Sequence, residues 1–520
     1  MYIAFIELNF PKNSNGVDTL NNKIRKQKIT RIKLGGTPRV LDLFSGCGGI
    51  SLGFHSAGYQ IIGAIEFDKR AAESHAFNFH NCSQDLHQST RDITKLDPDE
   101  LIRELGINEN VECAVDVIIG GPPCQAYSRI GRAKLREVRD HPEASLNDPR
   151  GNLYLRYLEY VRQLQPIALL MENVPDMLDF GGQNIANEVC ESLSEMGYEC
   201  KYTLLNSAFY GIPQMRERLF LIAYTKELGK VPVFPSPTHW IDLPTGYKTT
   251  RRVAQRNIAA ANLIKEQQFF VSPPEPTSNL PLAVTAKDAL ADLPQVRIHL
   301  EGKLKKGIRR FDQLLKYSKN KDLSQYASLM RNWPGFENSK GVYDHVLRYL
   351  PRDYAIFARM NPGDEYPEAY RHAWNIFEEK LSILEESGMK IEVDSEEYKA
   401  LKKSTVPPYD PNKFANKWRK MEADRPARTL MAHLGRDGYS HIHYDSSQAR
   451  TITPREAARL QSFPDGFIFK GSMDAAFKQI GNAVPPLLAH TLAVEMAKAI
   501  GIKQCTPIFQ GGGALEYEFS

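Results

Sequence analysis

The chain has 520 residues, which is enough for two or three hydrophobic cores. Hydrophobic residues make up 42% and charged residues 25%, a composition that excludes a disordered, collagen-like or coiled-coil protein. No apolar run is long enough to span a membrane, and the apolar start lacks the basic lead of a secretory signal. The seven cysteines form no C-x-x-C pair, so we expect no disulfide framework, no metal site and a reducing cytoplasm as the compartment.

Positive charge gathers in the middle of the chain. The net charge of +4 is too small to indicate nucleic acid by itself. Residues 225–425, however, contain 33 Lys and Arg against 26 Asp and Glu, which leaves the remainder of the chain at −3. We therefore expect a polyanion to lie against this middle region.

Short apolar runs alternate with helical patterns in the first half of the chain. Before them, residues 1–37 include a basic stretch, for which a solvated arm or a capping strand is favoured over a DNA-contacting arm. The alternation predicts an α/β fold: a Rossmann-like, mostly parallel sheet with helices on both faces. The apolar runs cover 39–44, 60–67, 115–121 and 167–174, and helical patterns extend to Ala57, over 68–80, over 153–164 and near 184–196.

This rhythm stops near Tyr224. Residues 230–282 are rich in proline and are predicted to form loops. Residues 283–425 mix short helical stretches with basic clusters such as the one at 303–310, which predicts a smaller mixed domain. An orderly pattern returns from Arg425 and ends in a helix at about 485–500.

A glycine cluster follows the first predicted strand. Gly46, Gly48 and Gly49 allow the backbone to turn tightly and to approach a nucleotide-like ligand. Glu66, at the end of the second strand, can hold the ribose hydroxyls of an adenosine group, and Asp92 can accept from its adenine amino group. A purely structural turn remains an alternative, and NAD is as plausible as any other adenosine cofactor.

Cys124 and Glu172 follow the next two strands. Cys124 comes after two glycines and two prolines at a strand-to-loop junction, a context that favours a nucleophile over a buried small side chain. Parallel strands end at one edge of a sheet, so the Glu172 carboxyl should lie in the same crevice. Burial would raise its pKa, although Glu172 could instead cap the following helix.

Two later motifs contain groups suited to polar ligands. Gln214, Arg216 and Arg218 alternate along an extended segment and share one face, where two guanidinium groups suit carboxylate or phosphate; an exposed basic edge is the alternative. Asn482 lies in QIGNAVPP, which we expect to open the last helix, so that its side chain and free backbone amides reach a ligand or simply cap the helix.

In this order, the motifs resemble the DNA (cytosine-5) methyltransferase family, especially its single-chain bacterial members. The resemblance covers about 39–224 and 425–495. Small departures are Tyr127, where Phe is commoner, and Arg91, where Gly is usual. The matching motifs are Phe44–Gly49, Pro123–Gln125, Glu172–Val174, Gln214–Arg218, Arg455–Pro464 and Gly481–Val484.

The resemblance implies a role for each matched residue. Cys124 would be the nucleophile, and Glu172 with Arg216 and Arg218 would hold the cytosine. Further substrate contacts would come from Gln125, Ser128, Asn173 and Gln214. S-adenosylmethionine would bind against Phe44, Gly46, Gly48, Gly49, Glu66, Phe67, Asp92, Ile93, Pro123, Leu153 and Asn482.

The resemblance also implies the fold and the partners. We expect the class I methyltransferase fold, with an N-terminal arm (1–37), a catalytic domain in two parts (38–224 and 426–503), a target-recognition domain (225–425) and a tail (504–520). The enzyme would methylate C5 of a flipped cytosine in a specific double-stranded DNA sequence through a Cys124–C6 adduct. It would be a cytoplasmic, nucleoid-associated bacterial monomer without an obligatory protein partner, and would protect host DNA beside a separate restriction endonuclease.

Other functions compete with this hypothesis. A transfer-RNA cytosine-5 methyltransferase shares the catalytic residues, but the large basic insert argues against it. Glu172 stands where two-cysteine RNA methyltransferases carry a second cysteine. A nicotinamide oxidoreductase would leave Cys124, Glu172 and Arg216 unexplained, and a non-catalytic DNA-binding subunit needs no nucleophile.

Overall fold

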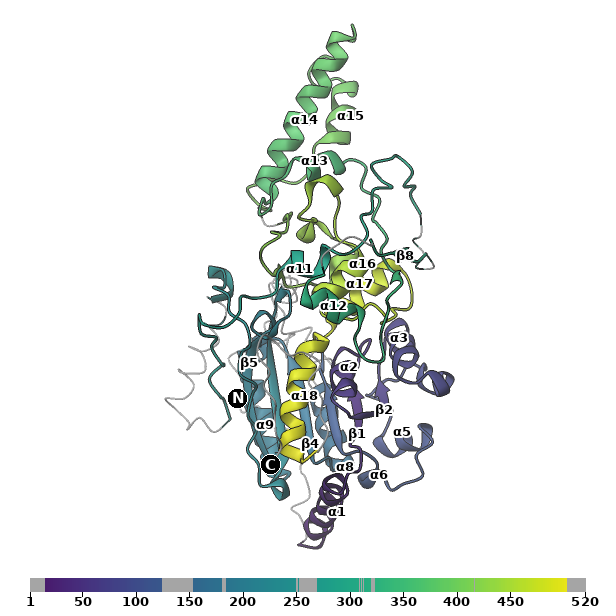
Figure 1. Cartoon of the computed structure of the whole chain (residues 1–520), viewed down its shortest axis with the longest axis vertical. Coiled ribbons are helices and arrows are strands. Elements are labelled where there is room, and N and C mark those ends of the chain that lie inside the picture. The colour runs from purple at the N-terminus through teal and green to yellow at the C-terminus, as the bar shows by residue number, and fades with distance from the viewer. Residues whose placement is uncertain are drawn as a thin grey trace, which may run out of the picture.

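The structure is a computed structural model of the chain. It describes residues 15–123, 153–179, 184–248, 251, 269–307, 309, 311, 313–318, 323–415 and 417–502. An α/β body occupies one end of the molecule, and a helical projection occupies the other (Figure 1). Three predicted site residues, Cys124, Gln125 and Ser128, lie outside the described residues, as does the tail over 504–520.

A six-stranded sheet in the order β2-β1-β3-β4-β7-β5 forms the centre of the α/β body. β1 pairs in parallel with β2 and β3, and β3 with β4, whereas β7 is antiparallel to both β4 and β5. Within this sheet β7 therefore runs against the other strands, which confirms the predicted mostly parallel sheet. The strands are β1 (Arg39–Leu43), β2 (Gln60–Ile65), β3 (Val117–Gly120), β4 (Ala168–Asn173), β5 (Tyr198–Asn206) and β7 (Glu217–Thr225).

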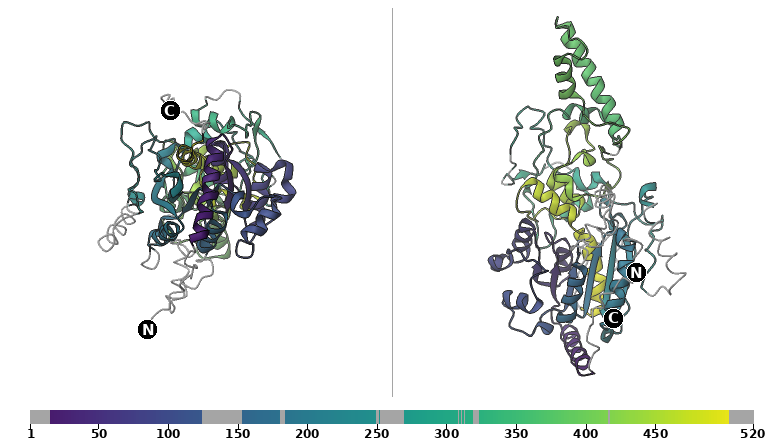
Figure 2. Two further views of the ribbon diagram at one scale, coloured as in Figure 1. Left: turned by 90° about the horizontal axis from the view of Figure 1, so that it is seen from below. Right: turned by 180° about the vertical axis from the view of Figure 1, so that it is seen from behind.

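Helices cover both faces of the sheet (Figure 2). Val40 of β1 packs into a core shared with α2 and α18, whereas Leu41 and Leu43 enter the core that α8 and α9 share. Successive strand side chains point to opposite faces, so a continuous apolar run requires two covers. The helices of this body are α2 (Gly49–Ser56), α3 (Lys69–Phe79), α4 (Gln84–His87), α5 (Pro98–Glu104), α6 (Val111–Ala114), α8 (Leu153–Leu164), α9 (Ile185–Glu195) and α18 (Pro486–Ile500).

The N-terminal segment differs from the prediction. Residues Asn15–Lys33 form helix α1, which packs against the sheet at the amino ends of its strands rather than extending as a solvated arm. Ile24, Ile29 and Ile32 are buried in this contact. The buried Lys28 ammonium donates to the carbonyl oxygens of Val115, Leu164 and Gln165 at 2.6, 2.9 and 3.1 Å. The basic pattern obscured an amphipathic helix because basic side chains form part of its buried face.

The middle region is divided between two cores. Helices α11 (Ala286–Leu290) and α12 (Gln325–Arg331), together with Trp333, share the core of α2 and α18. α16 (Pro454–Leu460) and α17 (Met473–Asn482) pack there as well. A separate core surrounds Trp418 and involves α13 (Tyr354–Arg359), α14 (Tyr366–Glu386) and α15 (Glu396–Thr405). Short two-stranded sheets join β6 (Gln214–Met215) to β10 (Ala427–Arg428) and β8 (Leu315–Lys316) to β9 (Gly341–Val342).

The helical projection in Figure 1 is an antiparallel hairpin of α14 and α15. Its base packs around Trp418, but its distal part, residues 378–397, contains no buried residue. This distal part has eight acidic residues and two lysines. The positive charge of the middle region is therefore confined to its other segments.

Helix α2 is held against α18 by glycine. A Cβ on Gly53 would lie 2.4 Å from the backbone nitrogen of His490 and 2.5 Å from Cβ of Ala489. A Cβ on Gly49 would lie 2.3 Å from the Val484 carbonyl oxygen. The close approach fixes the start of α2, and with it the preceding glycine turn, relative to the C-terminal helices.

Replacement of Gly53 by alanine should therefore destabilise the protein. Alanine favours a helix by about 1 kcal/mol over glycine, but the added methyl group has no room, and overpacking typically costs about 1–3 kcal/mol. We expect a lower free energy of unfolding in urea for Gly53→Ala. Gly246→Ala is the control, because nothing lies within 4 Å of a Cβ there. Equal stability of the two variants would contradict this packing.

Candidate active site

The turn between β1 and α2 has an unusual backbone. Phe44, Gly46 and Gly48 have positive φ values of 62°, 55° and 100°. A Cβ on Gly48 would lie 2.4 Å from the Phe79 ring, whereas nothing lies within 4 Å of a Cβ on Gly46. Gly48 thus permits close packing inside the protein, and Gly46 leaves open space on the other side of the turn.

Glu66 lies at the carboxyl end of β2 and is bound to this turn. Its carboxylate accepts hydrogen bonds from the backbone nitrogens of Gly46, at 2.8 Å, and of Asp68, at 2.6 Å. Burial raises the pKa of Glu66, and the two backbone donors oppose this effect. The neighbouring Phe67 side chain is 75% exposed, which leaves its ring available for stacking.

Asp92 and Ile93 form the next turn beside β2. The Thr94 hydroxyl and backbone nitrogen donate to Oδ1 of Asp92 at 2.7 and 3.0 Å, and the hydroxyl bond lowers the pKa of Asp92. Ile93 is buried, and Leu153 at the start of α8 is half-buried. Asp92 therefore offers an ionised carboxylate at this edge of the sheet.

Asn482 and Pro123 are both exposed. The structure places Asn482 at the end of α17, not at the opening of the last helix, so the expected use of free N-terminal amides there is wrong. The chain turns through Ala483 and Pro485 before α18 begins. Pro123 is the last described residue before Cys124.

Glu172 lies at the carboxyl end of β4, beside the end of β3. Its Oε1 forms an ion pair with Nε of Arg218 at 3.1 Å, and a Cβ on Gly121 would lie 3.0 Å from its Oε2. Burial raises the pKa of Glu172, although Arg218 and Arg216 act in the opposite direction. A raised pKa favours the protonated form of this carboxyl group, the form that can donate a proton.

The other predicted substrate contacts bind the protein backbone. Asn173 donates to the Pro122 carbonyl oxygen at 3.2 Å and accepts from Val174 N at 2.8 Å. Gln214 donates to the Leu460 carbonyl oxygen at 3.2 Å and accepts from the backbone nitrogen of Leu430 at 2.9 Å. These amides hold the chain segments around the site, and their predicted contact with substrate stays a prediction.

Arg216 is buried and does not pair directly with Glu172. Its Nη1 donates to the Leu430 carbonyl oxygen at 3.0 Å, which connects β6 to the segment after β10. The sequence predicts that Arg216 and Arg218 share one face of the segment. In the structure, Arg218 contacts Glu172, and the charge of Arg216 acts to lower the pKa of Glu172.

Residues 38–498 match the family model described as C-5 cytosine-specific DNA methylase. The chain belongs to this family. It is 40% identical over 467 residues to a putative type II methyltransferase, M.OihORF3336P, of Oceanobacillus iheyensis, with 89% of this chain and 96% of the relative aligned. Type II methyltransferase M.AgeI of Thalassovita gelatinovora is 29% identical, with 89% of this chain and 100% of the relative aligned.

Among solved structures, the chain resembles that of a putative DNA modification methyltransferase encoded within an Escherichia coli prophage. The TM-score is 0.54 at 21% sequence identity, and the match covers 89% of this chain and 99% of the other. This likeness shows the fold. The predicted family, fold class and enzyme class are thus confirmed: the protein is a DNA (cytosine-5) methyltransferase, and its cofactor is S-adenosylmethionine. The nicotinamide oxidoreductase hypothesis is wrong.

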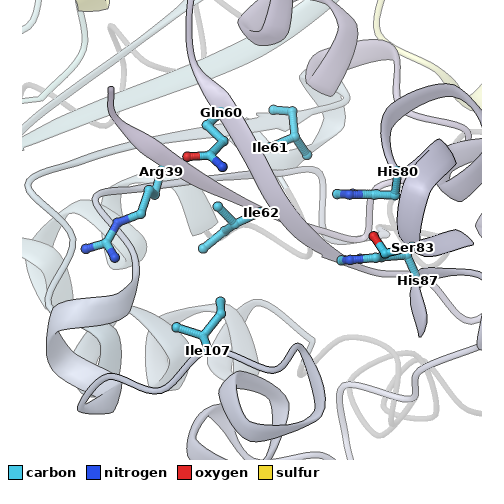
Figure 3. Close-up of a pocket in the computed structure, with 8 residues that line it drawn as sticks. All are labelled: Arg39, Gln60, Ile61, Ile62, His80, Ser83, His87 and Ile107. Atoms are coloured by element: carbon cyan, nitrogen blue, oxygen red, sulfur yellow. The ribbon is translucent and has the colours of Figure 1, made fainter. Parts of the chain in front are cut away.

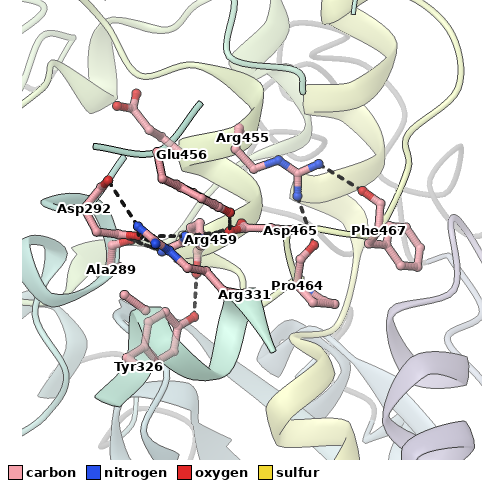
Figure 4. Close-up of polar contacts among 12 residues, drawn as sticks. Ala289, Asp292, Tyr326, Arg331, Arg455, Glu456, Arg459, Pro464, Asp465 and Phe467 are labelled. Carbon is pink, nitrogen blue, oxygen red and sulfur yellow. Dashed lines mark hydrogen bonds and ion pairs between the residues drawn. The ribbon is translucent and has the colours of Figure 1, made fainter. Parts of the chain in front are cut away.

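The family motif at Arg455–Pro464 builds a buried charge network that local sequence patterns did not reveal (Figure 4). Arg459 contacts Asp465 at 2.6 Å and Asp292 at 3.0 Å, and Arg331 contacts Asp292 at 2.6 Å. Asp292 is far away in the sequence, in a segment without a recognisable motif. The network joins the catalytic return segment to the middle region.

A cavity of about 350 Å³ lies at the outer edge of β2, away from this network (Figure 3). None of the candidate site residues lines it. The residues that line it are Arg39, Gln60, Ile61, Ile62, His80, Ser83, His87 and Ile107.

Among the described residues, no helix is long and apolar enough to cross a membrane, and no cluster of three metal-ligating side chains is found.

Asp292→Asn should destabilise the protein strongly. Burial alone would raise the pKa of Asp292, but Arg459 and Arg331 hold it below the ordinary value. This carboxylate therefore stabilises the fold at neutral pH, and its contribution is lost as the pH falls through that lowered pKa. Removing one partner of a buried ion pair costs about 3–5 kcal/mol.

Urea unfolding at pH 7 measures this effect. Asp474→Asn is the control, because Asp474 pairs with Arg348 at 2.8 Å but is 59% exposed. A loss for Asp292→Asn no larger than that of the control would show that the network does not stabilise the fold.

Proposed function

We propose that the enzyme methylates C5 of a cytosine flipped out of double-stranded DNA, through a covalent bond between the sulfur of Cys124 and C6. The observation that carries this proposal is the Glu172–Arg218 pair at the carboxyl end of β4, adjoining the Gly121–Pro123 segment that leads to Cys124. A nucleophile, a proton donor and a cation then belong to one crevice.

The cofactor residues predicted from the sequence suit an adenosine group. Gly46 leaves space beside the glycine turn, Glu66 presents a carboxylate for the ribose hydroxyls, and the Phe67 ring can stack on adenine. Asp92 would accept from the adenine amino group, and Ile93, Pro123, Leu153 and Asn482 would complete the contacts. S-adenosylmethionine supplies the methyl group when it is bound there.

The reaction requires C5 of cytosine to become electron-rich. The Cys124 thiolate would add to C6, which moves negative charge toward N3 of the ring. Glu172 would stabilise that charge by placing a proton or a strong hydrogen bond at N3. Arg218 and Arg216 would hold the base and the Glu172 carboxyl in register. After C5 has gained the methyl group, a base removes the C5 proton, the C6–sulfur bond breaks and the thiolate leaves.

Stacking in a duplex hides C5 and C6, so the cytosine must leave the stack, which costs a few kcal/mol. Phosphate contacts from the basic middle region would offset this cost. Lys303, Lys305 and Lys306 are exposed and suit phosphate, whereas the acidic distal hairpin at 378–397 does not. We assign sequence recognition to the middle region and host-DNA protection in restriction–modification to the enzyme, which would act as a monomer beside a separate endonuclease.

Bisulfite sequencing of DNA from cells that express the protein tests the activity, base and site together. We expect one methylated sequence context that then resists a matching endonuclease. Labelled methyl transfer to transfer RNA instead of DNA would overturn the assignment of substrate.

Cys124→Ala should abolish methyl transfer while DNA binding persists, because the variant lacks only the nucleophile. Duplex DNA containing 5-fluorocytosine should trap a covalent complex with the wild type, since fluorine at C5 cannot leave as a proton does. Denaturing gels measure the trapped species, and Cys113→Ala is the control. Trapping by Cys124→Ala would rule out the proposed bond.

Glu172→Gln should lower the rate of methyl transfer about 100-fold, the lower end of the usual contribution of general acid catalysis. Because the pKa of Glu172 is raised, the wild-type rate should fall as rising pH deprotonates it, and the variant should lack this limb. Single-turnover rates between pH 6 and 9 measure both effects. Glu195→Gln, an exposed change on α9, should behave like the wild type.

A further inference from the structure

We propose that Arg91 and Arg156 together form a clamp that positions the Asp92–Ile93 turn for the adenine end of the cofactor. The inference rests on the proposed function, since it takes Asp92 as the acceptor for the adenine amino group. Arg91 stands where the family usually has glycine, and Arg156 belongs to none of the motifs that carried the resemblance.

Arg91 ties the turn to one side. Its backbone nitrogen donates to the Glu66 carbonyl oxygen at 2.8 Å, which joins the turn to the end of β2. Its guanidinium group donates to the Leu86 carbonyl oxygen at 2.9 Å and pairs with Glu104 at 3.1 Å. The Arg91 side chain is only 5% exposed, whereas the Glu104 side chain is 44% exposed.

Arg156 holds the turn from helix α8. It projects from α8 and donates to the carbonyl oxygens of Ile93 and Leu96, both at 3.0 Å. The Tyr160 hydroxyl, one helical turn further along α8, also donates to Leu96 at 2.7 Å. One planar guanidinium group therefore holds the carbonyl groups of Ile93, in the turn, and of Leu96, directly after it. Lysine cannot reproduce this geometry.

The turn needs this support because the sheet gives it little. β2 is an edge strand of the described sheet, so no neighbouring strand pairs with its outer side there. Within the turn, Thr94 occupies Oδ1 of Asp92, and Lys95 approaches Oδ2 only to 3.8 Å. Oδ2 can thus accept from a ligand, but its direction depends on a backbone that the two arginines hold.

The clamp predicts a selective effect on the adenine contact. Adenine donates a hydrogen bond from its 6-amino group, whereas hypoxanthine has an oxygen there and cannot. A well-placed Asp92 should therefore favour S-adenosylhomocysteine over S-inosylhomocysteine, and a loosened turn should lose this preference.

The test measures both dissociation constants by calorimetry for Arg156→Gln and Arg91→Gln. We expect S-adenosylhomocysteine to bind about tenfold more weakly, consistent with the loss of hydrogen bonds to a charged group, and the adenosyl-to-inosyl preference to shrink. In steady-state assays, KM for S-adenosylmethionine should change more than kcat, and KM for DNA should stay constant.

Matched controls lie on α8, the helix of Arg156, and on α5, the helix of the Arg91 partner Glu104. Arg162→Gln on α8 and Arg103→Gln on α5 remove exposed arginines that pair with Glu159 and Asp99, and should bind both compounds like the wild type. If a glutamine variant does not fold, Arg156→Lys and Arg91→Lys keep the charge and should show a smaller loss of preference. Because both arginines act on one turn, the double variant should lose less than the product of the single losses.

Folded variants that keep the wild-type preference would overturn the clamp. So would an equal loss of affinity for both compounds, which indicates general destabilisation of the site. If the wild type itself bound S-adenosylhomocysteine but did not prefer it over the inosyl compound, the role of Asp92 would fail. Absence of any binding by the wild type would instead refute the proposed site.

Discussion

The parallel direction of β1 to β4 is the constraint on which the site depends. Because these strands end at the same edge of the sheet, the glycine turn and Glu66 lie at the same edge as Glu172, which is more than 100 residues further along the chain. Helix α1 occupies the opposite edge, at the amino ends of the strands, and leaves the functional edge open. The apolar strands require helices on both faces, and these helices then carry residues such as Arg156 to the site.

A second constraint is the burial of charge between the catalytic body and the middle region. Arg455 donates to the carbonyl oxygens of Pro464 and Phe467 and pairs with Asp344, while Arg459 engages Asp292 and Asp465. Buried guanidinium groups are costly unless every partner is in place, so the loss of one partner would leave a buried charge unpaired. The network therefore links residues 455–465 to the segments proposed to read DNA.

Sequence patterns predicted what depends on local periodicity and on motifs. The helix at 153–164, the strands β1 to β4 and the position of Glu172 at the end of its strand are of this kind. Helix α1 was missed because Arg25 and Lys28 lie on its buried face, where a pattern of apolar residues was expected. Asp292 and Asp344 could not be recognised, since only the folded chain brings them to Arg459 and Arg455. Asn482 was placed at the wrong end of a helix because proline and asparagine mark both helix starts and helix ends.

The acidic end of the α14–α15 hairpin gives the molecule an asymmetric electric field. Negative charge at 378–397 stands at the far tip of the hairpin, whereas the other segments of the middle region carry its net positive charge. A charge distribution of this kind repels a duplex from the tip and attracts it to the more basic segments, so it would orient the duplex before any base is touched. Fewer encounters then begin in an unproductive orientation, and added salt should weaken this guidance more than it weakens the final complex.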